Sequence, residues 1–107
     1  MNTYTVSIGR NVADIPMGDD MWADFIKNVC DTLHPYRVDN GSWVEFHTGH
    51  GEYGDTREDS AMVTLLSDRI LADWELISLR ATLMVVARHY GQECVALTIG
   101  TSELIFT

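Results

Sequence analysis

The residues with the clearest chemical potential gather in one short stretch, His47-Thr48-Gly49-His50-Gly51-Glu52. Imidazole nitrogens and carboxylate oxygens are metal ligands, and Asp55, Glu58 and Asp59 follow closely. Three glycines within residues 48–56 predict an irregular loop, in which nothing in the spacing fixes the ligand geometry. We therefore expect a solvated loop here, and we assign neither a metal nor a cofactor.

Catalysis needs an activated nucleophile beside a base, or paired carboxylates of different pKa. Ser60 follows two acids but lacks the surrounding glycines of a nucleophile elbow. His89 is expected near the end of a helix, where a cation also suits the helix dipole. Gly9 and Gly91 are isolated, so they form no phosphate-binding loop. The sequence assigns no catalytic residue and favours a protein that is not an enzyme.

The charge balance is strongly acidic, with 16 Asp and Glu residues against 7 Lys and Arg residues and a net charge of −9 over 107 residues. Such a surface repels nucleic acid and anionic lipid, so we expect no direct nucleic-acid partner and no membrane partner. No apolar run approaches the ~20 residues of a membrane span, and the N-terminus does not resemble a signal peptide. We expect a cytoplasmic protein in which Cys30 and Cys94 are buried, reduced thiols.

Alternating and helically periodic apolar residues predict a single α+β domain over residues 1–107. The element order is β-α-β-β-α-β-β, which is most simply a ferredoxin-like split βαβ arrangement with an antiparallel sheet and both helices on one face. The strand predicted at Ser60–Leu66 is expected in the sheet interior, and the last two predicted strands form a hairpin. The predicted strands are Tyr4–Ile8, Ser42–His47, Ser60–Leu66, Cys94–Ile99 and Glu103–Phe106, and the predicted helices are Asp19–Leu33 and Asp73–Tyr90.

The second predicted helix carries more apolar surface than one sheet face needs. One stripe contains Leu76, Leu79, Leu83, Val86 and Tyr90, and a second contains Trp74, Ile77, Ala81 and Met84. Because part of this surface needs another cover, we expect a homodimer.

The three tryptophans, Trp22, Trp43 and Trp74, fit core positions on the two helices and a strand. Trp43 shares a strand face with Glu45 and His47. If that face is the open side of the sheet, an exposed aromatic would indicate binding, and these residues would form a ligand face.

Several short motifs resemble small proteins, without assigned function, that are encoded by actinobacterial phages and their hosts. The motifs are Gly9-Arg10-Asn11-Val12, Pro16-Met17, Trp22 with Phe25, Glu58-Asp59-Ser60, and Tyr90-Gly91-Gln92-Glu93. The resemblance implies a phage or prophage accessory protein and supplies no catalytic residue.

Three functions are compatible with these features. The first is a small acidic protein-binding factor that modulates a host protein, with association speeded by charge. Its contact surface would consist of Asp19, Asp20, Asp24, Glu52, Asp55, Glu58 and Asp59. The second is a dimeric ferredoxin-like domain that binds or converts a small ligand, lined by Trp43, Glu45 and His47. The third is a nucleic-acid mimic that inhibits a host nucleic-acid-binding protein.

Overall fold

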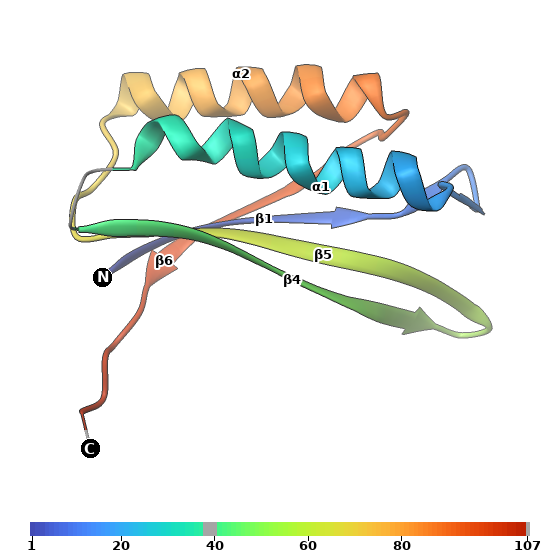
Figure 1. The fold of residues 1–107 in the computed structure, drawn as a ribbon, viewed down its shortest axis with the longest axis horizontal. Coiled ribbons are helices and arrows are strands. Elements are labelled where there is room, and N and C mark those ends of the chain that lie inside the picture. The colour runs from blue at the N-terminus through green and yellow to red at the C-terminus, as the bar shows by residue number, and fades with distance from the viewer. Residues whose placement is uncertain (38–40, 107) are drawn as a thin grey trace.

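The computed structural model describes residues 1–37 and 41–106, and it consists of two helices packed on one face of an antiparallel sheet (Figure 1). The sheet contains β1 (Asn2–Gly9), β4 (Ser42–Tyr53), β5 (Thr56–Ser67) and β6 (Ala96–Thr101) in the order β4-β5-β1-β6. The helices are α1 (Asp19–Leu33) and α2 (Asp73–His89). The predicted α+β class and the placement of both helices on one face are therefore confirmed.

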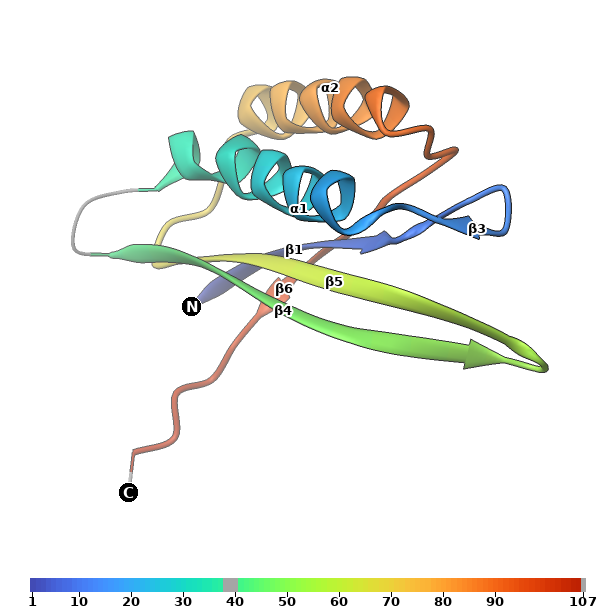
Figure 2. The ribbon, with the colours of Figure 1, turned by 45° about the vertical axis from the view of Figure 1, so that its right-hand side comes forward.

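Shorter elements complete the chain. β2 (Asn11–Val12) pairs with β3 (Ile15–Pro16) in a small separate hairpin beyond the end of β1, which Figure 2 shows clearly. A short 3-10 helix, η1 (His34–Tyr36), follows α1. Ala13 and Asp14 form the turn of the β2–β3 hairpin with φ of 48° and 68°. Among the described residues, none of the helices is both long and apolar enough to cross a membrane.

The core lies between the helices and the sheet face that they cover. Alternate residues of β1 and β5 point into it, because side chains alternate between the two faces of a strand. α1 contributes an apolar stripe at helical spacing. The largest fully buried apolar side chains are Tyr4, Val6, Phe25, Val29, Leu33, Val63, Leu65 and Leu79.

The β4–β5 hairpin is much longer than the sequence predicted, and the expectation of an irregular loop over residues 48–56 was wrong. Gly49 and Gly51 lie in β4 and pair with Ser60 and Glu58 of β5. Only Gly54 and Asp55 separate the strands, and Gly54 has a φ of +60°, which a tight two-residue turn favours. The glycines therefore continue the strand up to this turn, and β5 is an interior strand as expected.

The predicted C-terminal hairpin is absent from the described residues. Gly100 and Thr101 continue β6 and pair with Thr3 and Asn2 of β1. The backbone of Ser102 then exchanges hydrogen bonds with Met1 at 2.7 and 2.8 Å. Because this pairing draws residues 100–102 into the sheet, no turn forms there. Residues 103–106 leave the sheet without regular structure, as Figure 1 shows.

Three side chains lie elsewhere than expected. Trp22 is buried in the core as predicted, but Trp43 and Trp74 are exposed by 43% and 72%. Trp43 lies on the sheet face without helices, and Trp74 lies on the outer side of α2. Cys30 is half-buried, and burial raises the pKa of its thiol. Cys94 is exposed and precedes β6, so its predicted burial was wrong.

Candidate functional site

Segments that are far apart in the sequence meet at one end of the molecule, around Arg10. The Arg10 Nε donates to the Met17 carbonyl oxygen at 2.7 Å, and the Met17 backbone N–H donates to the Arg10 carbonyl at 3.0 Å. The guanidinium also pairs with the carboxylates of Asp59 at 3.2 Å and Asp19 at 2.6 Å. Arg10 thus joins the end of β1 to β5 and to the start of α1.

Glu58 is held beside this junction by a backbone N–H group of the residue that follows Arg10. Its Oε2 accepts a hydrogen bond from the Asn11 backbone N–H at 2.8 Å. The carboxylate also lies against Gly9, where an added Cβ would approach its oxygens to 2.6 Å. Any larger residue at position 9 would push Glu58 away, so the glycine sets the position of the carboxylate.

The end of α2 completes the junction from the other side. Gly91 has a φ of +73°, the Gly91 N–H donates to the Arg88 carbonyl, and the Gln92 N–H donates to the Ala87 carbonyl. This is a Schellman motif, which satisfies the last carbonyls of a helix. The Gln92 Nε2 then donates to the Asn11 carbonyl oxygen at 3.0 Å.

The motifs behind the phage-protein resemblance therefore converge in space. The stretches containing Arg10, Met17, Glu58 and Gln92 share the hydrogen bonds described above. Trp22, Phe25 and Tyr90 continue the cluster as an aromatic series, with Phe25 stacked on Tyr90 at a ring-centroid distance of 4.7 Å. The Asn28 side-chain amide donates to the Tyr90 hydroxyl. This network orders one end of the molecule.

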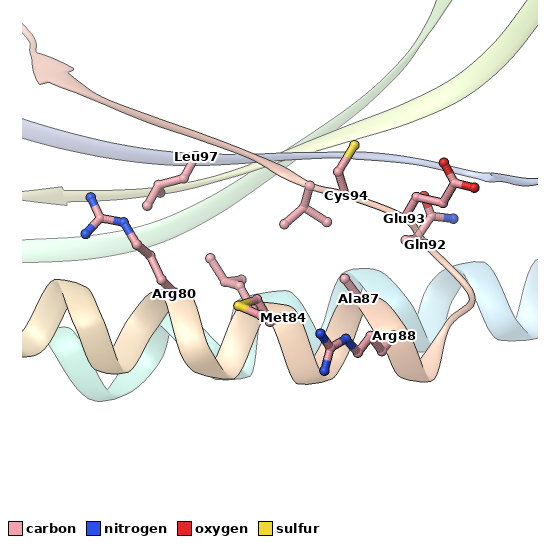
Figure 3. A pocket seen from close by; sticks show the side chains of 10 residues that line it. Arg80, Met84, Ala87, Arg88, Gln92, Glu93, Cys94 and Leu97 are labelled. Carbon is pink, nitrogen blue, oxygen red and sulfur yellow. The ribbon is translucent and has the colours of Figure 1, made fainter.

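Two hollows adjoin the junction. The α2–β6 groove has a volume of about 420 Å³, and its lining includes Arg80, Met84, Ala87, Arg88 and Leu97. Figure 3 shows Met84, Ala87 and Leu97 between helix and strand, with Arg80 reaching toward β6. The Glu58 hollow, of about 370 Å³, is lined by Glu58, the β2–β3 turn and Gly91.

The two hollows lie next to each other, since the linings of both include Gln92, Glu93 and Cys94, and together they make up the candidate surface. Its composition is mixed, with an apolar floor, two arginines at the α2 side and carboxylates at the junction side. Concave, mainly apolar surfaces with a few polar groups are where small ligands bind. We regard this surface as the candidate functional site.

Arg80 and Arg88 are the residues that sequence reasoning missed. Neither forms an ion pair with a carboxylate of residues 1–37 or 41–106, although the chain is strongly acidic. Their spacing of eight residues places them about two turns apart along α2, and in Figure 3 Arg80 reaches toward β6 whereas Arg88 extends along the helix. That spacing was visible in the sequence, but the groove depends on β6, which is distant along the chain.

The acids predicted to form a contact surface lie mostly at the same end of the molecule. Glu52 and Asp55 lie at the tip of the β4–β5 hairpin, and Asp19, Asp20 and Asp24 lie near the start of α1. Figure 1 shows both regions at the end of the molecule where β1 finishes. Asp19, Glu58 and Asp59 are engaged within the chain through Arg10 and Asn11.

Trp43, Glu45 and His47 share one face of β4, as predicted, and it is the face that no helix covers. Their register partners on β5 are Leu66, Thr64 and Met62. The His47 Nε2 lies 3.7 Å from a Glu45 carboxylate oxygen. Neither hollow described above includes these residues, so the structure places them together on an open surface.

His47 and His50 point to opposite faces of β4, because three residues separate them in a regular strand. A single metal ion therefore cannot bind both side chains. Within the described part of the chain, His, Cys, Asp and Glu side chains form no group of three that could hold a metal ion.

Comparison with known proteins gives likenesses of fold. Neither a protein-family model nor a curated protein sequence matches the chain. A phage SAM lyase in complex with S-methyl-5'-thioadenosine matches with a TM-score of 0.56 and 13% identity, over 92% of this chain and 79% of that one. A phage SAM lyase in the apo state matches with a TM-score of 0.56 and 15% identity, over 98% and 92%.

A third solved structure has the same fold in a bacterial protein. It is a DUF3240 family protein from Shewanella baltica, with a TM-score of 0.51 and 15% identity over 99% of this chain and 94% of that one. At these identities the comparisons establish a shared small α+β fold with an antiparallel sheet and two helices.

Proposed function

We propose that this chain is a small phage-type enzyme that binds S-adenosylmethionine at the concave surface between α2, β6 and Glu58, and that it releases S-methyl-5'-thioadenosine. The observation that carries the proposal is that two adjoining hollows are lined by the held Glu58 carboxylate and by Arg80 and Arg88. Neither arginine forms an ion pair with a carboxylate of the part of the chain that the structure describes. The likeness in fold to phage SAM lyase supports it. This proposal replaces the non-enzymatic role favoured by the sequence.

The charges of the surface suit this ligand. S-adenosylmethionine carries a sulfonium and an ammonium group as well as a carboxylate, so it needs partners of both signs. Glu58 would bind the cationic end, and Arg80 or Arg88 the carboxylate, since guanidinium groups bind carboxylates well. Met84, Ala87 and Leu97 would cover the apolar parts of the ligand. The net charge of −9 would attract a cationic substrate.

The reaction requires little covalent chemistry from the protein. When the bond between the sulfonium sulfur and the aminobutyryl carbon breaks, both bonding electrons stay on sulfur, and the product is a neutral thioether. The remaining fragment is neutralised by losing a proton or by closing onto its own carboxylate. The chain therefore has to orient the substrate, and orientation alone contributes large rate enhancements. No cofactor takes part.

The decisive experiment incubates the purified protein with S-adenosylmethionine and measures S-methyl-5'-thioadenosine by chromatography and mass spectrometry. We expect product from the natural chain, and a loss of at least about tenfold in kcat/KM for Glu58→Gln, because the amide keeps the hydrogen bond to Asn11 but loses the charge. Glu52→Gln at the hairpin tip is the matched control and should keep full activity.

Two results would separate the possibilities. Absence of product together with absence of a thermal shift by S-adenosylmethionine or S-methyl-5'-thioadenosine would refute the proposal. Binding of either compound without turnover would refute the catalytic part and leave a ligand-binding domain.

A second candidate is the acidic protein-binding factor, in which the chain modulates a host protein. The clustering of Glu52, Asp55, Asp20 and Asp24 at one end of the molecule favours it. Binding should weaken as salt rises. The charge reversals Glu52→Lys and Asp55→Lys should abolish capture of the same host protein, whereas Asp31→Lys on the far half of α1 should not. If the captured protein binds nucleic acid and nucleic acid displaces this chain, the chain acts as a nucleic-acid mimic that inhibits that host protein.

The expected fold, phage origin and cellular location are also part of this proposal. We infer a ferredoxin-like fold, supported by the order β4-β5-β1-β6 with both helices on one face. A phage or prophage origin is supported by the two phage SAM lyase structures of similar fold and by the convergence of the resembling motifs. We place the protein in the cytoplasm, where S-adenosylmethionine is made.

A further inference from the structure

The outer face of α2 carries a regular apolar seam that the chain itself leaves uncovered. Trp74, Ile77, Ala81, Met84 and Arg88 recur at alternating spacings of three and four residues. Trp74 and Ile77 are exposed by 72% and 65%, and Met84 by 53%. The buried side of the same helix consists of Glu75, Leu79, Leu83 and Ala87. A three–four spacing is the seam of two helices that pack along each other.

The ends of this seam carry opposite charges. Asp73 is the first residue of α2, and Arg88 and His89 lie in its last turn. Two copies of α2 running antiparallel would place Asp73 of each copy beside Arg88 of the other, and would also oppose the helix dipoles favourably. Ala81 lies near the midpoint between Asp73 and Arg88, where a small side chain lets two helices approach closely.

We propose that a second copy of this chain covers the outer face of α2, forming an antiparallel, two-fold symmetric helix pair. Ile77 then faces Met84 of the second copy on either side of Ala81, and Trp74 lies near Arg88 of the second copy, where a cation–π contact is available. A symmetric interface uses the same patch on both subunits, and a self-complementary seam with oppositely charged ends meets that condition. Met84 and Arg88 belong to this seam and also to the lining of the α2–β6 groove, so the assembly is tested by molecular mass and not by activity.

The test measures molecular mass by sedimentation and light scattering over a series of concentrations. We expect the natural chain to move toward twice the 12.0 kDa chain mass as concentration rises through the micromolar range. Asp73→Arg alone and Arg88→Asp alone each place like charges together at both ends of the seam. Each should weaken self-association by about tenfold or more.

Mixing the two variants is the sharper measurement. Asp73→Arg in one copy then meets Arg88→Asp in the other, and the unaltered Arg88 meets the unaltered Asp73. The mixture should form a mixed dimer more tightly than either variant associates with itself. A parallel pair would place each residue 73 beside residue 73 of the other copy, so like charges would face each other in the natural chain and in either single variant alike. Weakening in both single variants, followed by recovery in the mixture, therefore supports the antiparallel arrangement.

Ile77→Asp provides a second route that does not alter the helix ends. Its circular dichroism should match the natural chain, and its mass should remain that of a monomer. A natural chain that stays monomeric throughout the series would overturn the proposal. A dimer that survives Ile77→Asp but is lost in Trp43→Asp would also overturn it, because the open sheet face would then be the interface.

Discussion

The two helices cover the same sheet face, yet they divide their surfaces differently. α1 buries six residues, Trp22, Phe25, Ile26, Val29, Thr32 and Leu33, and its opposite side is largely polar. α2 buries only Glu75, Leu79, Leu83 and Ala87, although it is two residues longer, with 17 residues against 15. Its outer side is apolar instead. The apolar residues of α1 thus serve one contact, whereas α2 has a second apolar face that is exposed.

The two helices also differ in how their ends are fixed. α1 begins after Gly18 without a side-chain cap, and its first turn is tied to the junction through the Arg10–Asp19 pair. α2 is fixed at its start by Glu75, which accepts from the Ala72 backbone N–H and from the Arg69 guanidinium. It is fixed at its end by the Schellman motif at Gly91. Both ends of α2 are therefore fixed by hydrogen bonds, in addition to the packing of its narrow buried stripe.

The largest expected effect tests the broad buried face of α1. Phe25 is fully buried, stacks on Tyr90 and packs edge-on against Trp22. Phe25→Ala should reduce the free energy of unfolding by about 3–5 kcal/mol, because the removed ring leaves a cavity. Denaturant unfolding measures this change. Met21→Ala on the exposed side of α1 is the control, and an equal loss in both variants would mean that α1 does not depend on its buried stripe.

The next effect tests how α2 is held at its end. Gly91→Ala forces a side chain into a φ of +73° and brings its Cβ to 3.1 Å from Val12 Cγ1. We expect a loss of about 1–3 kcal/mol in the free energy of unfolding, since a residue other than glycine is strained there. Gly18→Ala, with ordinary φ and no atom within 4 Å of the added Cβ, should be nearly neutral. Equal stability of the two variants would show that the cap contributes nothing.

The start of α2 gives a pH-dependent test. The Arg69 guanidinium, with the Ala72 N–H, lowers the pKa of the Glu75 carboxyl from 4.5 to about 2. A lowered folded-state pKa stabilises the fold above the unfolded value, and this contribution is lost as the pH falls from 4.5 toward 2. Glu75→Gln should therefore flatten the pH dependence of stability in that interval, measured by thermal unfolding. Asp31→Asn, at the exposed Lys27 pair, should leave the curve unchanged.

A feature of the fold could be predicted from the sequence where the residues that determine it lie within one segment of the chain. Both helices were predictable because apolar periodicity is set within one segment, and the second stripe of α2 was visible before its exposure was known. The extension of β4 past Gly49 was not predictable, because it depends on pairing with β5. The terminal hairpin failed for the same reason, since Met1 holds Ser102 in the sheet. The Arg10 junction joins residues up to 81 positions apart, so spacing alone does not reveal it.

The smallest expected effect is also the one that separates the two surfaces of α2. Ile77 is 65% exposed, so Ile77→Ser should change the stability of the dilute monomer by less than about 0.5 kcal/mol. Leu79→Ala, two residues away on the buried stripe, should cost about 2–5 kcal/mol. Denaturant unfolding at low and high protein concentration should show that only Ile77→Ser loses the concentration dependence of the midpoint. If the two variants lose stability equally at low concentration, the outer stripe of α2 already packs within its own chain. That stripe would then not be a separate contact surface.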